Sequence, residues 1–247
     1  MCPDGKMASK LYCNFKIHKE HVHIPPVRPI ISGSGSILEN PSKFVDFHIK
    51  DLATSHKSYL QDTPDFIRKI EHINTNHKLS QNAMLVTLDA IALYTNIPQH
   101  EGAQATEHAL NERENQSIPR EYILSMLKII LKNNIFTFNE KYYILEEGTS
   151  MGPMDAPHYT DIFMSRNIDP HIEELFKIYE EKKKFNFMTR FLDDIFKLFA
   201  GTSQNLHMFL DELNKIHPSI KFTMSHNNNR FEDLSTKCTC PPQDSIQ

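Results

Sequence analysis

The residues best suited to chemistry are two adjacent carboxylates inside an apolar run. Asp193 and Asp194 lie within RFLDDIF, residues 190–196, and aromatic residues alternate on both sides of them. This alternation predicts two strands, with the aspartates at the tip of a hairpin between them. Carboxylates at such a tip suit a divalent cation, because hard cations bind carboxylate oxygens. Taken alone, however, an Asp-Asp pair is more often an ordinary polar turn.

A second segment supplies a third carboxylate. Residues 86–88 are typical of a short buried strand, and this strand ends on Asp89. Tyr94 follows, just before residues 95–98 end in proline and stop the regular structure. Three carboxylates are the set that two-metal phosphoryl transfer needs, where two cations stabilise the attacking and leaving oxygens. The sequence therefore predicts a Mg²⁺ site, with Mn²⁺ as a substitute.

Five blocks of sequence, in order, resemble the reverse transcriptases of Penelope-like retroelements, a group related to telomerase reverse transcriptases. The resemblance extends from about residue 11 to about residue 234. The blocks are LYCNFKIHK followed by PPVRPIIS (11–32), LDAIALYTNIP (88–98, motif A), EGTSMGPMDAPHYTDIFM (147–164, motif B), RFLDDIF (190–196, motif C) and LNKIHPSIKFTMS (213–225). What the resemblance implies is an RNA-directed DNA polymerase that uses an RNA template, a DNA primer and deoxynucleoside triphosphates.

The resemblance also implies roles for residues of motifs A and C. Asp89 and Asp193 would be the principal metal ligands and catalytic carboxylates, with Asp194 as the third carboxylate. The backbone carbonyl of Ala90 would be a further metal ligand. Tyr94 falls at the position of the steric gate, whose ring would disfavour ribonucleotides.

Nucleotide contacts are implied by the first block and by motif B. Arg28 would contact the incoming triphosphate, since a guanidinium suits bidentate phosphate contact. Gly148, Met151 and Gly152 would let the backbone approach the nascent base pair, because glycine has no Cβ. The residues that would contact nucleic acid in the first block are Lys16 and Lys19.

Motif B departs from the pattern of the resembled family in three acidic residues. Glu147 stands where glutamine is common, and Asp155 and Asp161 add further negative charge. Carboxylates near a nucleotide would repel its phosphates. These residues, the expected lack of a thumb and the net charge of −4 leave one alternative to an active enzyme: a truncated, catalytically inactive relic with weak or no nucleic-acid binding.

The expected fold is α+β: a right-hand polymerase fingers and palm, with an antiparallel palm sheet backed by helices and the thumb largely missing. We expect a fingers-like region over 1–85, a palm over 86–234 and a disordered tail over 235–247. Residues up to about 43 are expected to be rich in loops. Helical spacing is found over 41–77, 101–111, 120–133, 169–183 and 203–216, with a further helix start near 156; a hairpin is expected over 135–145 and a strand over 220–225.

The composition sets further bounds. The chain has 247 residues and a net charge of −4, which is not the balance of a protein whose whole surface binds nucleic acid. A local basic track is still compatible with a polymerase; Lys182–Lys184 is a candidate, although it equally fits a solvated helix end. No apolar run approaches the roughly 18 residues of a membrane span, and no secretory signal begins the chain. We therefore expect a nuclear or cytoplasmic protein.

Two other groups of residues are expected to carry no chemistry. The cysteines at 2, 13, 238 and 240 lack the spacing of a zinc site and are expected to be free thiols. The histidines at 18, 21 and 23 are expected to be exposed in a loop.

Overall fold

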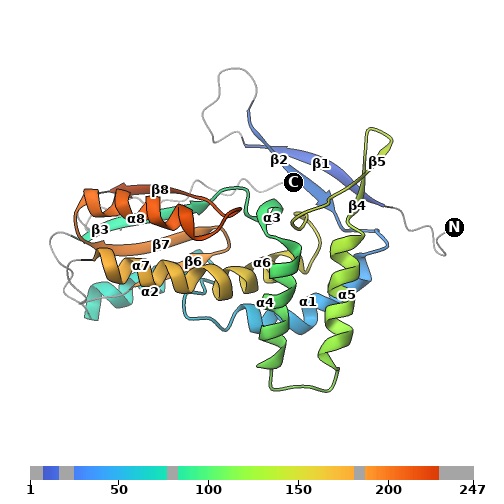
Figure 1. Cartoon of the computed structure of the whole chain (residues 1–247), viewed down its shortest axis with the longest axis horizontal. Coiled ribbons are helices and arrows are strands. Elements are labelled where there is room, and N and C mark those ends of the chain that lie inside the picture. The colour runs from blue at the N-terminus through green and yellow to red at the C-terminus, as the bar shows by residue number, and fades with distance from the viewer. Residues whose placement is uncertain (1–7, 17–24, 77–82, 181–186, 228–247) are drawn as a thin grey trace.

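The computed structural model describes residues 8–16, 25–76, 83–180 and 187–227, and the remainder is drawn as a thin grey trace in Figure 1. Several features singled out in the sequence lie outside the described residues. They are Lys19, the histidines at 18–23, Lys182–Lys184, the cysteines at 2, 238 and 240, and the tail 235–247. None of the helices in the described ranges is both long and apolar enough to cross a membrane.

The described residues form an α+β fold with two four-stranded sheets, which confirms the α+β class that the sequence predicts. The larger sheet has the order β6-β7-β3-β8, and all of its pairs are antiparallel. Its strands are β3 (Ala83–Ala90), β6 (Met188–Phe191), β7 (Asp194–Ala200) and β8 (Phe222–Asn227). The motif A strand is thus central, with the motif C hairpin beside it.

The second sheet has the order β2-β1-β4-β5. Its strands are β1 (Ser9–Phe15), β2 (Val27–Ser32), β4 (Ile135–Phe138) and β5 (Lys141–Ile144). The expectation of loops up to about residue 43 is therefore wrong, because β1 and β2 form an antiparallel ladder. Their side chains are mostly exposed, so the alternation that signals a half-buried strand is weak in this part of the chain. This sheet takes strands from both sides of residue 85; the domain boundary placed there stays a prediction.

The helices largely follow the predicted periodicity. The segment 41–77 is two helices separated by a loop, and the helix expected over 203–216 has those bounds. The helices are α1 (Glu39–Ala53), α2 (Thr63–Asn76), α3 (Leu93–Asn96), α4 (Gln99–Asn111), α5 (Arg120–Lys132), α6 (Ala156–Phe163), a π-helical turn η1 (Met164–Ile168), α7 (Asp169–Tyr179) and α8 (Ser203–Ile216).

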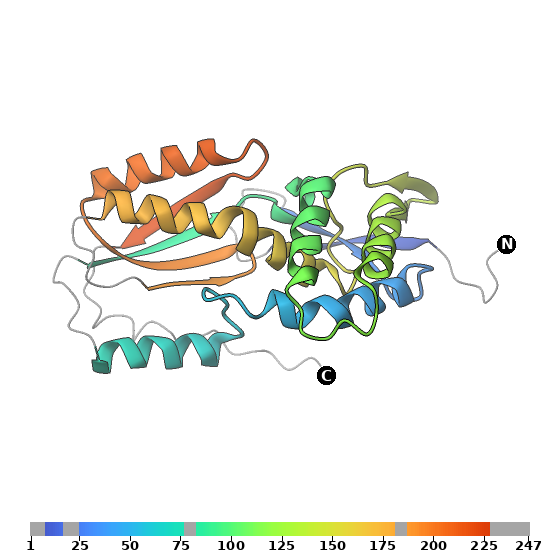
Figure 2. The ribbon, with the colours of Figure 1, turned by 60° about the horizontal axis from the view of Figure 1, so that its bottom comes forward.

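The two faces of the larger sheet differ (Figure 2). Alternate residues of β3, Val86 and Leu88, are buried, whereas Thr87 and Asp89 between and after them are exposed. The buried face packs on α7 and α8, where the rings of Phe176 and Phe209 stack at 4.1 Å. Because strand residues alternate between faces, this packing directs Asp89 to the opposite, more open face of the sheet.

Helix α2 lies over that opposite face. The ring of Phe66 in α2 meets the ring of Phe196 in β7 edge-on, at 4.9 Å between centroids. The neighbours of Phe196 in β7, Ile195 and Lys197, are buried on the other face. Figure 2 shows α2 on the side of the sheet away from α7 and α8.

Candidate active site

The three predicted carboxylates come together where β3 and β7 meet. Asp89 and Asp194 are directly opposite each other in the antiparallel ladder, and Asp193 lies in the turn before β7. The backbone N–H of Ala90 donates to the carbonyl oxygen of Asp193 at 3.0 Å. Leu192 takes a left-handed conformation with φ 53°. The turn is therefore tight, and it consists of Leu192 and Asp193. Asp194, which the sequence also placed at the tip, is instead the first residue of β7 and is paired with Phe191.

The electrostatics of the turn centre on Asp193. Burial raises the pKa of this carboxyl above its usual value, and the charge of Asp89 raises it further, whereas Arg28 and Lys16 act in the opposite direction. A cation bound beside Asp193 would favour the ionised form of this carboxyl group. Residues of β2, of β3 and of the segment just after β1 thus act on one carboxyl group.

Arg28 and Tyr94 both lie within electrostatic range of Asp193. Arg28 is exposed on β2, opposite Asn14 in the ladder, and forms no ion pair with any described residue. Tyr94 is 9% exposed, and burial is the main reason that its pKa is raised to about 12; Asp193 also raises this pKa and Arg28 lowers it. The Tyr94 hydroxyl therefore stays neutral across the physiological range.

The motif B glycines approach protein backbone. A Cβ at Gly148, where φ is +73°, would lie 2.5 Å from the carbonyl oxygen of Thr95. A Cβ at Gly152, where φ is +135°, would lie 2.0 Å from the carbonyl oxygen of Ile31. Backbone hydrogen bonds run beside them, from Thr149 N–H to Tyr94 C=O and from Ile31 N–H to Met151 C=O, each 2.8 Å. The loop therefore joins the segment of Tyr94 to β2, the strand that carries Arg28.

A buried arginine supports the carboxylate turn from behind, and sequence reasoning assigned it no role. The side chain of Arg190 is fully buried; its Nε lies 3.0 Å from both carboxylate oxygens of Asp169, and it also pairs with Asp161. The same guanidinium donates to the carbonyl oxygen of Leu192 at 3.2 Å. Its terminal nitrogen also lies 3.3 Å from a ring nitrogen of His56. A charged residue inside the apolar motif C run was the available signal, since buried charges need partners.

The acidic residues of motif B are mostly not on the surface. Asp155 and Asp161 are 1% and 3% exposed, whereas Glu147 is exposed. Although burial favours the neutral acid, a hydrogen bond from His56 and the charge of Arg190 hold the pKa of Asp161 below its usual value. Two of the three charges expected to repel a nucleotide are therefore enclosed within the protein.

The carboxylates at this turn are the type of ligand that Mg²⁺ prefers. Among the described residues, no three His, Cys, Asp or Glu side chains group closely enough to hold a metal ion by themselves. Mg²⁺ commonly binds through one or two carboxylates together with substrate phosphates. Asp89 and Asp193, with Asp194 across the ladder, offer carboxylates of this kind; the metal roles of these residues and of Ala90 stay predictions.

Comparison with known proteins identifies the fold. No protein-family model matches the chain, and no curated protein sequence matches it. Solved structures do match. The apo telomerase of Candida tropicalis, truncated from its C-terminal domain, superimposes with a TM-score of 0.61 at 13% identity, covering 94% of this chain and 52% of that one. The telomerase of Candida albicans in complex with a fragment of telomeric RNA gives 0.62 at 10% identity, covering 91% and 42%.

A viral polymerase matches equally well. The RNA polymerase complex inside a double-stranded RNA virus gives a TM-score of 0.62 at 11% identity, covering 91% of this chain and 21% of that one. The chain thus spans about half the length of the first of these proteins and less of the others. At such identities the similarity identifies a polymerase-like fold, of the fingers and palm, shared by telomerase reverse transcriptases and viral RNA polymerases.

Proposed function

We propose that this chain is the fingers and palm of an RNA-directed DNA polymerase of the Penelope-like retroelement type. The observation that carries the proposal is the convergence on Asp193: Asp89, Arg28 and Lys16 all act electrostatically on its carboxyl group. Carboxylates with an arginine and a lysine within electrostatic range are what a triphosphate and its counter-cation require.

The reaction is transfer of a deoxynucleotide to a primer. The 3′ oxygen of the primer attacks the α-phosphorus, the bond from that phosphorus to the oxygen bridging to the β-phosphate breaks, and pyrophosphate leaves. The hydroxyl proton departs to solvent. Mg²⁺ or Mn²⁺ held by Asp89, Asp193 and Asp194 would lower the pKa of the 3′ hydroxyl and neutralise charge on the phosphates.

The residues of the chain bind and orient the nucleotide. Arg28, which has no competing ion pair among the described residues, is available to the triphosphate. Lys16 adds a second positive charge that acts on Asp193. The ring of Tyr94 is held by burial next to this charge and would lie against the sugar, disfavouring a 2′ hydroxyl. Through their backbone contacts, Met151 and the motif B glycines would fix the position of Tyr94 relative to Arg28.

Nucleic-acid partners are supported by the structural matches. The Candida albicans telomerase was solved with telomeric RNA. An RNA template and a DNA primer for this chain are inferred from that fold and from the resemblance of its motifs. The match to a viral RNA polymerase raises RNA synthesis as a second candidate; the buried aromatic ring of Tyr94 favours deoxynucleotides.

Primer extension tests the proposal. The chain would be incubated with an oligo(rA)–oligo(dT) substrate, dTTP and Mg²⁺ or Mn²⁺, and compared with Asp193→Asn. Extension by the parent chain that disappears in the variant is the expected result. A chain that is folded by circular dichroism but extends no primer with either metal would indicate the inactive alternative. Replacing dTTP with UTP separates DNA synthesis from RNA synthesis.

A further inference from the structure

We propose that a groove along α2 binds the phosphate backbone of the primer strand several nucleotides behind its 3′ end. This inference rests on the proposed polymerase function and adds a binding surface to it. The groove consists of two neighbouring cavities that both contact Thr189 of β6. We call them the aromatic cavity and the basic cavity.

The aromatic cavity begins at the carboxylate turn. It has a volume of about 460 Å³, and Asp194 is part of its wall. Three phenylalanines line it: Phe66 of α2, Phe191 of β6 and Phe196 of β7. Apolar walls with threonine hydroxyls beside them suit sugars and bases better than phosphates. A strand whose 3′ end lies at the carboxylates would pass through this space first.

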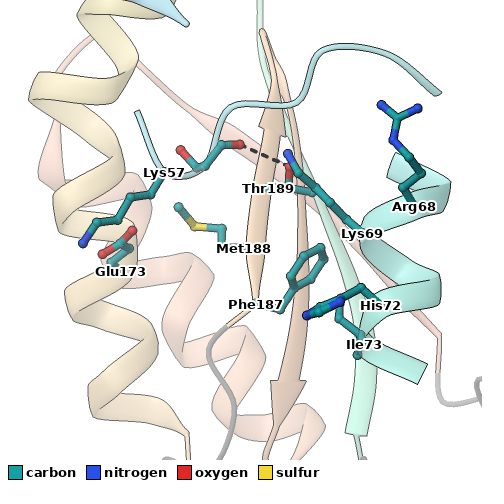
Figure 3. A pocket seen from close by; sticks show the side chains of 10 residues that line it. Lys57, Arg68, Lys69, His72, Ile73, Glu173, Phe187, Met188 and Thr189 are labelled. Carbon is teal, nitrogen blue, oxygen red and sulfur yellow. Dashed lines mark hydrogen bonds between the residues drawn. The ribbon is translucent and has the colours of Figure 1, made fainter. Parts of the chain in front are cut away.

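The basic cavity continues along the edge of the sheet. It has a volume of about 540 Å³ and lies between α2, the edge strand β6 and α7 (Figure 3). Its charged lining residues are Lys57, Arg68 and Lys69 against the single carboxylate of Glu173, with His72 beside them. A net positive cavity on a chain whose net charge is −4 is a local feature, and its natural ligand is a polyanion.

Two of these cations retain capacity for a ligand. Lys69 is engaged, because its ammonium group lies 2.9 Å from Asp65 and donates to the carbonyl oxygen of Tyr59 at 2.5 Å. Arg68 reaches Asp65 only at 3.5 Å, and its side chain is 64% exposed. Lys57 is exposed on the α7 side of the cavity, near Glu173 (Figure 3). Arg68 and Lys57 therefore frame the cavity from opposite walls.

The spacing fits a nucleic-acid strand. Phe191 is opposite Asp194 in the ladder, and the basic cavity reaches Phe187, four positions away along the chain. At about 3.3 Å per strand residue this is roughly 13 Å. A strand that rises about 3.4 Å per nucleotide covers that distance in about four nucleotides. The phosphate near the fourth or fifth linkage from the 3′ end would thus reach Lys57 and Arg68.

The cations sit on a fixed framework. Residues 58–60 pair with β6: the N–H of Arg190 donates to the carbonyl oxygen of Ser58 at 2.6 Å, and the N–H of Leu60 donates to that of Arg190 at 3.0 Å. This pairing sets the position of Lys57 relative to the sheet. The contact between Phe66 and Phe196 does the same for α2. A fixed backbone lowers the conformational freedom that is lost when the side chains of Lys57 and Arg68 bind a ligand.

The test is binding of primer–template to the full chain, measured by fluorescence anisotropy as a function of salt. The double variant Lys57→Ala with Arg68→Ala removes the two proposed phosphate contacts. For this variant, the slope of log affinity against log salt should be smaller in magnitude than that of the parent by roughly 1.4 to 1.8, which is about 0.7–0.9 per lost phosphate contact. The control is Lys128→Ala with Lys132→Ala, two exposed lysines of α5, whose slope should equal that of the parent.

A neutral linkage locates the contact on the primer. A methylphosphonate at the fourth and fifth linkages from the 3′ end should weaken binding by the parent but not by the double variant, whereas one at about the twelfth linkage should weaken neither. Equal salt slopes of the parent and the double variant, or equal sensitivity of both to the neutral linkage, would refute primer binding in the groove. Neither result would bear on the polymerase proposal. A folded parent that binds no primer–template would overturn both.

Discussion

The guanidinium of Arg190 is paired with the carboxylate of Asp169 inside the protein, with Nε 3.0 Å from each oxygen. This pair lies immediately behind the turn that carries Asp193. Removing one partner of a buried ion pair leaves an uncompensated charge, which costs about 3–5 kcal/mol. We therefore expect Arg190→Met to lower the free energy of unfolding by about that amount in urea denaturation.

The control for Arg190→Met also neutralises the two carboxylates that pair with Arg190. A triple variant, Arg190→Met with Asp161→Asn and Asp169→Asn, should recover part of the lost stability, because neutral amides are less costly to bury than charges. A single variant as stable as the parent would mean that Arg190 is not held by these two carboxylates.

Asp155 should make stability depend on pH. Burial, partly offset by a hydrogen bond from Ser42, raises the pKa of Asp155 from 3.8 to about 6. A raised folded-state pKa contributes stability below about pH 4, and that contribution is lost as the pH rises through 6. At pH 7 to 8 Asp155→Asn should therefore be more stable than the parent, by up to about 3 kcal/mol.

Urea denaturation between pH 4 and 8 measures this effect. The advantage of Asp155→Asn should be absent near pH 4 and grow with pH. Asp51→Asn, an exposed position on α1, is the control and should follow the parent. A constant difference in the free energy of unfolding between Asp155→Asn and the parent at every pH would refute the raised pKa of Asp155.

Gly148 should tolerate no side chain, and Gly35 provides a matched control. Both glycines have a similar positive φ, +73° and +71°, but a Cβ at Gly35 would meet nothing within 4 Å. Gly35→Ala should therefore cost only the backbone strain of about 1–2 kcal/mol. Gly148→Ala should cost at least about 2 kcal/mol more, because the Thr95 backbone must move. Similar thermal stabilities of the two variants would contradict this reading.

Tyr94 should select the sugar of the incoming nucleotide. If its ring blocks a 2′ hydroxyl, Tyr94→Val should raise the ratio of ribonucleotide to deoxynucleotide incorporation roughly tenfold or more. Tyr94→Phe keeps the ring and should leave the ratio unchanged. Single-nucleotide extension with dTTP and UTP measures both. An unchanged ratio of ribonucleotide to deoxynucleotide incorporation in Tyr94→Val would contradict a steric role for Tyr94.

Much of the fold follows from periodicity, because the elements that form it have one buried and one exposed face. Alternation around 190–199 predicts two strands, and residues 86–88 predict a short buried one; the structure contains them as β6, β7 and β3. The hairpin over 135–145 turns at Asn139 and Glu140, both with positive φ, the backbone that a two-residue hairpin turn requires.

The parts that could not be predicted depend on distant partners. Arg190 pairs with residues 21 and 29 positions away and contacts His56, 134 positions away, which no local pattern reveals. The contacts of Gly148 and Gly152 with Thr95 and Ile31 are likewise visible only once the chain has folded. The strands β1 and β2 escaped detection because few of their side chains are buried.

The claim on which the account depends is that Asp89 and Asp193 share a divalent cation. Titration of the chain with Mn²⁺, followed by electron paramagnetic resonance of the free ion, measures this without requiring catalysis. We predict that Asp89→Asn and Asp193→Asn each weaken Mn²⁺ binding at least roughly tenfold, while Asp51→Asn does not. Equal Mn²⁺ affinity in the parent and in both site variants would contradict the account.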